Sequence, residues 1–434
     1  MDVTIVAGLI LLISFVVLLV IGVPISVSIG IAATLSAFVL VPWDIAVFTA
    51  AQKLTSGIDS FALLAIPFFI LAGSIMNNGG IALRLINLAK LISGRLPGSL
   101  AQTTVVGNLF FGSVSGSGVA AAATIGGIMH PLQKKEGYDP ALSATVNIAS
   151  SPTGLLIPPS NAFIVYALVS GSASISALFM AGVIPGILMG LTVMIVTHFL
   201  FHRQNLPSHE RLSWTQVGKI LIQSIPSLLL IVVVIGGISF GVFTATEGAA
   251  VAVLYSLILS LIYRSIHWEH IPKILKETVV LSSIVLFLIG ASSILSWVMA
   301  FTGLPSLISE GMLGMTDNPF IILLIMIMIL LLVGTVLDMT PAILIFTPMF
   351  LPIANGLGVD PVHFGIILVF ALCIGIMTPP VGSCLFVGCS VANVRIEQVF
   401  RPLSRMVVAL VITLLLVAYI PEISLTLPRW FGFL

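Results

Sequence analysis

The stretch ASSPTGLLIPPSN, residues 149–161, interrupts a segment that otherwise has the composition of a membrane helix. Pro158 and Pro159 each lack a backbone N–H, and proline also disfavours helical geometry in the residue before it. An irregular backbone at membrane depth is tolerated only where protein or a water-filled cavity surrounds it, because hydrocarbon offers no hydrogen-bond partners. The fold must therefore bury or hydrate this break.

The composition indicates a polytopic α-helical membrane protein. Of the 434 residues, 59% are hydrophobic and 7% are charged, whereas soluble domains carry about 25% charged residues. Apolar blocks long enough to cross a bilayer recur, for example at 5–21, 222–242 and 407–420. The first block lacks the basic flank and the cleavage site of a signal peptide. The net charge of +1 argues against a nucleic-acid partner.

A second double proline lies in CIGIMTPPVGS, residues 373–383, so that Pro379 and Pro158 are 221 positions apart. The same gap-free shift relates Gly154 to Gly375, and the pair Asp139-Pro140 to Asp360-Pro361. Coincidences of this kind at turn and helix-breaking residues predict an internal duplication. We expect a first repeat at 1–202, a linker at 203–221 and a second repeat at 222–434.

The distribution of basic residues predicts that the two repeats are inverted. The turn before Asp139 reads QKKEGYDP and carries Lys134 and Lys135, whereas its mate ANGLGVDP carries no base. Because basic residues favour the cytoplasmic side, the first turn is expected in the cytoplasm and its mate outside. The basic linker is expected to be cytoplasmic as well. Inverted-topology repeats are typical of secondary transporters.

Each repeat also contains an apolar segment too interrupted to cross the membrane, and we expect it to form a re-entrant hairpin. The hairpins are expected at about 98–130, with the tip GSVSGSG at 112–118, and at about 319–352, with the tip GTVLDM at 334–339. Each hairpin precedes a broken helix, at about 140–171 and 361–391. The tips and the breaks are expected to meet near the middle of the membrane.

These four interruptions offer oxygen atoms to a cation. Unwound carbonyls and hydroxyl groups at such breaks coordinate Na⁺ in secondary transporters. We predict at least two Na⁺ sites and no organic cofactor. The first set of residues is Ser113, Ser115, Ser117, Gly154, Ile157 and Pro159, and the second set is Gly334, Thr335, Gly375, Thr378 and Val381. The simpler alternative is that proline only kinks these helices, while glycine and serine only allow tight packing.

Polar residues beside the breaks are candidates for binding the substrate. Half-helix N-termini carry partial positive charge and free N–H groups, which suits an anion. The candidates are Asn147, Ser150, Ser151, Ser160, Asn161 and Asp338. Asp338 is the one acid of the second tip, and it could bind a cation, a substrate group or a proton. Its structural alternative is to cap the helix that begins near Thr340.

Four segments resemble the signature segments of a known family, the large membrane subunit (M, or DctM-like) of tripartite ATP-independent periplasmic (TRAP) transporters. These segments are SVSGSGVAAAATIG (113–126), SSPTGLLIPPSN (150–161), LDMTPAILIFTPMFLPI (337–353) and GIMTPPVGSCLFVG (375–388). The resemblance covers essentially the whole chain. It implies an elevator-type transporter of the ion-transporter superfamily in the bacterial inner membrane, and not an enzyme. Its cargo would be a C4-dicarboxylate, sialic acid or another sugar acid, moved together with Na⁺.

The resemblance also implies partners. A periplasmic substrate-binding protein would deliver the organic anion, and a small membrane subunit (Q, or DctQ-like) would pair with this chain in the lipid bilayer. Because the sequence starts directly with the M-like segment, we expect that subunit as a separate polypeptide. Three alternatives stay open: a stand-alone Na⁺/anion symporter without a binding protein, a passive channel, and an intramembrane enzyme. The enzyme would need paired acids or a nucleophile–base pair at depth, and Asp338 is solitary.

Overall fold

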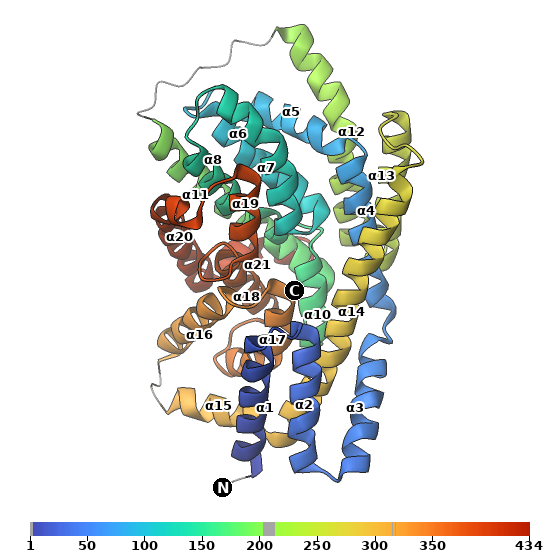
Figure 1. Ribbon diagram of the computed structural model, residues 1–434, viewed down its shortest axis with the longest axis vertical. Coiled ribbons are helices and arrows are strands. Elements are labelled where there is room, and N and C mark those ends of the chain that lie inside the picture. Colours follow the sequence, from blue (N-terminus) through green and yellow to red (C-terminus); the bar gives the residue numbers. More distant parts are fainter. Residues whose placement is uncertain (1–2, 203–212, 315, 317) are drawn as a thin grey trace.

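The computed structural model describes residues 3–202, 213–314, 316 and 318–434, and every regular element within these ranges is a helix (Figure 1). Eight of the described helices are long and apolar enough to cross a membrane, and one bent pair forms a further candidate span. The expected all-α polytopic membrane fold is confirmed. The linker expected at 203–221 lies outside the described residues at 203–212, and a helix begins within it at Trp214.

The helices of the first half lead up to the first double proline and past it. They are α1 (Val3–Val20), α2 (Ile25–Leu40), α3 (Trp43–Ile58), the short 3₁₀ helix η1 (Phe61–Leu64), α4 (Ala65–Asn78), α5 (Ile81–Ser93), α6 (Ser99–Ser115), α7 (Gly118–Lys135), α8 (Pro140–Ser150), α9 (Thr153–Leu156), α10 (Asn161–Ser170) and α11 (Ile175–Phe201). The carboxylate of Asp139 caps α8, accepting a hydrogen bond from the N–H of Ala141 at 2.7 Å. Pro140 occupies the first helical position, where its missing N–H costs nothing.

The helices of the second half lead up to the second double proline and past it. It contains α12 (Trp214–Ser239), α13 (Ala245–Ile262), α14 (His270–Thr302), α15 (Leu304–Leu313), α16 (Pro319–Gly334), α17 (Met339–Gly356), α18 (Pro361–Gly375), α19 (Ser383–Ala392), α20 (Ile396–Tyr419) and α21 (Glu422–Trp430). Asp360 caps α18 through the N–H of Val362, also at 2.7 Å, as Asp139 caps α8. The same local chemistry therefore starts the same helix in both halves.

Two packed helix pairs correspond to the segments where hairpins are expected. α6 and α7 pack against each other and are joined by Gly116 and Ser117, and α16 and α17 are joined by residues 335–338. In Figure 1 the α6–α7 pair lies in the upper half of the molecule and the α16–α17 pair in the lower half. α7 and α17 run past the predicted hairpin ends because Pro131 and Pro352 lie inside them instead of ending them.

Each double proline separates two helical pieces. α9 ends at Leu156 and α10 begins at Asn161, with a bend of 47° across the break. α18 ends at Gly375 and α19 begins at Ser383. In both breaks the peptide bond between the two prolines is cis. Residues 157–160 and 376–382 are thus the non-helical backbone that the surrounding protein has to accommodate.

Paired glycines hold each break against the helix pair of its own half. Gly112 of α6 faces Gly154 of α9, and a Cβ atom on Gly112 would lie 2.8 Å from the Gly154 Cα. Gly334 of α16 faces Gly375 of α18, and a Cβ atom on Gly334 would lie 3.0 Å from the Gly375 Cα. Backbone therefore packs directly on backbone at both places, which only glycine permits.

The two halves interlock. α10 packs against α17, and α19 packs against α7, so that the helix after each break contacts the second arm of the other half's pair. Two contacts join residues 221 positions apart: the Thr192 and Thr413 hydroxyls are hydrogen-bonded at 2.8 Å, and the Cys373 thiol donates to the Pro152 carbonyl at 3.5 Å. Helices α3, α4, α13 and α14 form a column along one side (Figure 1).

We expect Gly375→Ala to destabilise the protein, because the new methyl group has no room beside Gly334. Overpacking of this kind costs about 1–3 kcal/mol. Gly127→Ala is the matched control, since Gly127 is exposed in the middle of α7 and a Cβ atom there meets nothing within 4 Å. The measurement is the midpoint of thermal unfolding of the purified protein. Equal midpoints for the two variants would contradict the close packing.

Candidate functional site

A cavity of about 290 Å³ lies where the two tips meet the α4–α14 wall. Its polar and glycine lining consists of Ser74, Gly73, Asn77, Ser115, Gly116, Ser117, Asn161, Glu277, Asp338 and Thr340. The structure thus brings four sequence-predicted residues together around one space, although they come from both halves of the chain: Ser115, Ser117, Asn161 and Asp338. The volume suits a small organic molecule.

Three helix N-termini face this cavity. α7 begins after Ser117, α10 after Ser160 and α17 after Asp338. The Ser117 hydroxyl accepts a hydrogen bond from the N–H of Ala120 at 3.2 Å, but no described side chain caps α10 or α17. The first N–H groups of those two helices have no partner within their own helix. They carry partial positive charge and can receive an anion.

Asp338 does not act as a helix cap. Although it occupies the N-cap position of α17, its carboxylate accepts a hydrogen bond from the Ser383 hydroxyl at 3.1 Å. Ser383 is the first residue of α19, so this bond joins the second tip to the helix that follows the second break. The capping alternative is therefore wrong, and the exposed carboxylate faces the cavity.

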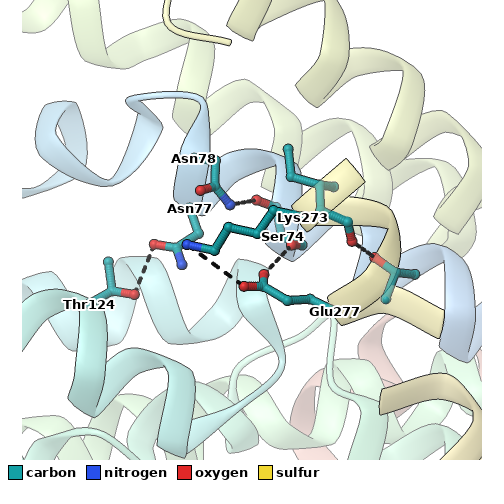
Figure 2. Close-up of polar contacts among 8 residues, drawn as sticks. Ser74, Asn77, Asn78, Thr124, Lys273 and Glu277 are labelled. Atoms are coloured by element: carbon teal, nitrogen blue, oxygen red, sulfur yellow. Dashed lines mark hydrogen bonds and ion pairs between the residues drawn. The ribbon is translucent and has the colours of Figure 1, made fainter. Parts of the chain in front are cut away.

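A second acid, Glu277 of α14, lines the opposite wall (Figure 2). Its carboxylate accepts a hydrogen bond from the Ser74 hydroxyl at 3.1 Å and lies 3.9 Å from the Lys273 ammonium group. Both charged side chains are substantially exposed, so this ion pair contributes little stability. Glu277 was not among the residues expected from the sequence, although an acid within a long apolar helix is itself a signal of function.

One side-chain hydrogen bond ties the first tip's helix to the wall. The Thr124 hydroxyl of α7 donates to the Asn77 Oδ1 of α4 at 2.9 Å (Figure 2). Gly73, one turn earlier on α4, lets that helix approach the Ser115 backbone, since a Cβ atom there would lie 3.2 Å from the Ser115 Cα. The contact between the first tip and α4 is therefore close, but it includes few side-chain hydrogen bonds among the described residues.

The first break leaves acceptors without partners. Among the described residues, no group donates a hydrogen bond to the carbonyls of Ile157, Pro158 or Pro159. The buried Ser113 hydroxyl donates to the Phe110 carbonyl at 2.9 Å, so its lone pairs stay available. Gly154 lies in α9, with its backbone against Gly112. Oxygen atoms free to accept further partners therefore lie at the first break.

The second break is held more tightly to its tip. The Thr335 carbonyl accepts hydrogen bonds from the N–H groups of Val381 at 3.0 Å and Gly382 at 3.3 Å. The Thr378 hydroxyl donates to the Ile374 carbonyl at 2.7 Å, and the Thr378 N–H donates to the Gly375 carbonyl at 2.8 Å. The carbonyls of Thr378 and Pro379 accept no hydrogen bond from the described residues. Backbone oxygens are thus also free at this break.

The other predicted substrate residues do not line the cavity. Asn147, Ser150, Ser151 and Ser160 are buried and make hydrogen bonds inside the protein. The Asn147 amide donates to the Ala122 carbonyl at 2.8 Å, and the Ser151 hydroxyl donates to the Ile148 carbonyl at 3.1 Å. Proximity to a break in sequence therefore did not place these side chains at the cavity.

Comparison with known proteins identifies the family. Residues 12–423 match the family described as "Tripartite ATP-independent periplasmic transporter, DctM component". The uncharacterized protein YgiK of Salmonella typhimurium is 53% identical over 96% of each chain. The sialic acid TRAP transporter large permease protein SiaM of Vibrio cholerae is 35% identical, covering 94% of this chain and 96% of its own.

A solved structure supports the fold. The crystal structure of the Alcanivorax borkumensis YdaH transporter covers 89% of both chains with a TM-score of 0.61, and at 15% identity this likeness concerns the fold alone. The eight apolar spans, the family match over residues 12–423 and the similarity to a named large permease protein agree with one another. The chain is a multi-pass membrane protein and belongs to the DctM family, the large permease component of TRAP transporters.

Proposed function

We propose that this protein is the large membrane subunit of a Na⁺-coupled importer of a small organic anion in the bacterial inner membrane. The observation that carries the proposal is the 290 Å³ cavity, at which both tips meet the N-termini of α7, α10 and α17. The similarity to a relative named for sialic acid supports an organic anion as the cargo. A C4-dicarboxylate or another sugar acid fits the same chemistry.

The charge of the cavity favours coupling to a cation. Its described lining carries two carboxylates, Asp338 and Glu277. Glu277 is paired with Lys273, whereas Asp338 has no ion-pair partner among the described residues. An anion about 6 Å from one carboxylate is disfavoured by about 3 kcal/mol at an effective dielectric constant near 20. The partial positive charge of each helix N-terminus stabilises the bound anion by only about 0.3–1 kcal/mol. A cation bound beside the cavity offsets the remainder, so anion and cation would bind together.

The free oxygens at the two breaks are the proposed Na⁺ ligands. At the first break these are the Ser113 and Ser115 hydroxyls with the carbonyls of Ile157 and Pro159, and at the second break the Thr378 hydroxyl with nearby carbonyls. With two Na⁺ per monoanion, a tenfold gradient gives about 1.4 kcal/mol per ion and 100 mV gives about 2.3 kcal/mol per charge. The net yield of about 5 kcal/mol would support accumulation of a few thousandfold.

The interlocked tips and breaks support an inverted duplication in which these segments of both halves move together. In a two-fold arrangement, a residue can contact the equivalent residue of the other half only where both lie near the symmetry axis. The Thr192–Thr413 and Pro152–Cys373 contacts are of this kind. In an elevator mechanism the tips and breaks would slide together along the α4–α14 wall. The Thr124–Asn77 hydrogen bond lies across this boundary and would break during the movement.

A periplasmic binding protein and a small membrane subunit are part of the proposal, following the family. The test is uptake into proteoliposomes in which the Na⁺ gradient and the voltage are set separately, with sialic acid and succinate as probes. We expect uptake only with inward Na⁺ and with both partners present. Full uptake in K⁺ would refute the coupling. Uptake that needs Na⁺ but no binding protein would instead favour the stand-alone symporter.

We expect Ser115→Ala and Thr378→Val to raise the Na⁺ concentration for half-maximal uptake by about tenfold each, because losing one ligand oxygen costs about 1–1.5 kcal/mol. Ser404→Ala is the control, since Ser404 is exposed and its hydroxyl only donates to the Arg401 carbonyl. The measurement is the Na⁺ dependence of initial uptake rates. An unchanged Na⁺ dependence in both variants would remove these two side chains from the ion sites.

We expect the Ala120→Cys thiol to react with a small hydrophilic thiol reagent, because Ala120 lines the cavity. The adjacent Ala121 is fully buried, so Ala121→Cys is the matched control and should stay unreactive. Sialic acid or succinate together with Na⁺ should slow labelling of the Ala120→Cys thiol. Labelling is measured by mass spectrometry of the intact protein. Equal reactivity at the two positions would show that the cavity is not open to water.

A further inference from the structure

The interior of the first half contains a group of polar side chains that we call the polar seam. It consists of Thr104, Asn108, Gln133, Ser143, Asn147 and Ser150. They come from α6, α7 and α8, and each is at most 4% exposed. The family signature segments do not explain them, because most lie outside those segments.

The second half has apolar residues in all six equivalent positions. Gly112 packs on Gly154 as Gly334 packs on Gly375, so α6 and α16 are related by a shift of 222 positions. The elements that follow α6 and α16 are related by a shift of 221 positions. The mates of the polar seam are Met326, Leu330, Ala354, Phe364, Leu368 and Ala371, all of which are 0% exposed. The same helix arrangement therefore packs without polar side chains, and the fold itself does not require the seam.

The polar seam is only partly satisfied by its own hydrogen bonds. The Asn108 amide donates to the Asn147 Oδ1 at 3.1 Å and to the Ser150 hydroxyl at 2.7 Å, and Gln133 donates to the Thr104 hydroxyl at 2.9 Å. Yet the Asn108 Oδ1 and the Ser143 hydroxyl have no partner among the described residues. Buried polar atoms without partners are unfavourable and point to a bound molecule.

A small cavity is lined by Ser143. It measures about 10 Å³ and is bounded by Thr104, His130, Gln133, Ser143 and Asn147 among others. A polar cavity of about 10–15 Å³ is just large enough for one water molecule. Water in this place would provide the hydrogen bond that the Ser143 hydroxyl lacks.

A larger cavity adjoins the small one, because the two share lining residues. A cavity of about 650 Å³ shares His130 and Ala392 with it and is also lined by the exposed residues Lys134 and Asp139. At the inner end, the Thr153 hydroxyl donates to the Ser150 carbonyl at 2.6 Å, directly before the first break. Ser143 and Ser150 are about 10 Å apart along α8 at 1.5 Å per residue.

We propose that the polar seam binds water and forms a hydrated route for a small monovalent cation between the first break and the surface at Lys134. The water site stands on the seam and its cavities alone, whereas the passage of a transported cation rests on the proposed function. The apolar mates close the equivalent route in the second half. A cation released from the first break would therefore leave through the end of the molecule that carries Lys134 and Lys135.

Silver ions test the route, because Ag⁺ is a small cation that moves with water and binds thiolates. Cys373, Cys384 and Cys389 are first replaced by alanine. Ser143→Cys and Ser150→Cys then introduce single thiols in the seam, and Ala371→Cys, the mate of Ser150, is the matched control. Purified protein is exposed to Ag⁺ for set times, and the remaining free thiol is counted with a maleimide after denaturation.

We expect the Ser143→Cys and Ser150→Cys thiols to be lost at least tenfold faster than the Ala371→Cys thiol. Asn147→Leu replaces Asn147 by the residue type of its mate, Leu368. In combination with Ser150→Cys it should slow the loss of the free thiol at least tenfold, and in combination with Ser143→Cys it should leave the rate of thiol loss unchanged. Equal rates at all three positions, or no effect of Asn147→Leu, would overturn the route. Because labelling needs no transport, failure here leaves the Na⁺ dependence of uptake as a separate result.

Discussion

The structure depends on how it keeps unpaired peptide groups away from hydrocarbon. Both double prolines interrupt helices of a strongly apolar chain. Each interruption leaves carbonyls that accept no hydrogen bond from the described residues. The protein resolves this by direct backbone packing, Gly112 on Gly154 and Gly334 on Gly375. These contacts hold each break against the helix pair of its own half. The first break is largely buried there, whereas Pro380 and Val381 of the second break are exposed.

The interlocked halves then create a shared cavity from separate breaks. Because α10 packs on α17 and α19 on α7, helix N-termini from both halves converge on one space. The partial positive charges of these termini share the cavity with two carboxylates: that of Asp338, at the start of α17, and that of Glu277, on α14. A site with both signs of charge is suited to an anion and a cation together, and less suited to either alone.

The two halves share a backbone plan but differ in what fills it. The polar seam of the first half corresponds to apolar residues at the equivalent positions of the second half, and the second break is bonded to its tip through the Thr335 carbonyl. The two halves therefore share the framework of two breaks, while the side chains that surround the breaks differ.

Sequence alone determined the membrane class, the breaks at Pro158-Pro159 and Pro379-Pro380, and the helix starts at Asp139 and Asp360, because proline and N-cap chemistry act within a few residues. Only the tertiary structure decided which polar side chains share the cavity. It brought Ser74, Asn77 and Glu277 to the tips, joined Asp338 to Ser383, and placed Asn147 and Ser150 in the seam. Those outcomes depend on packing between segments far apart in the chain, which no local pattern records.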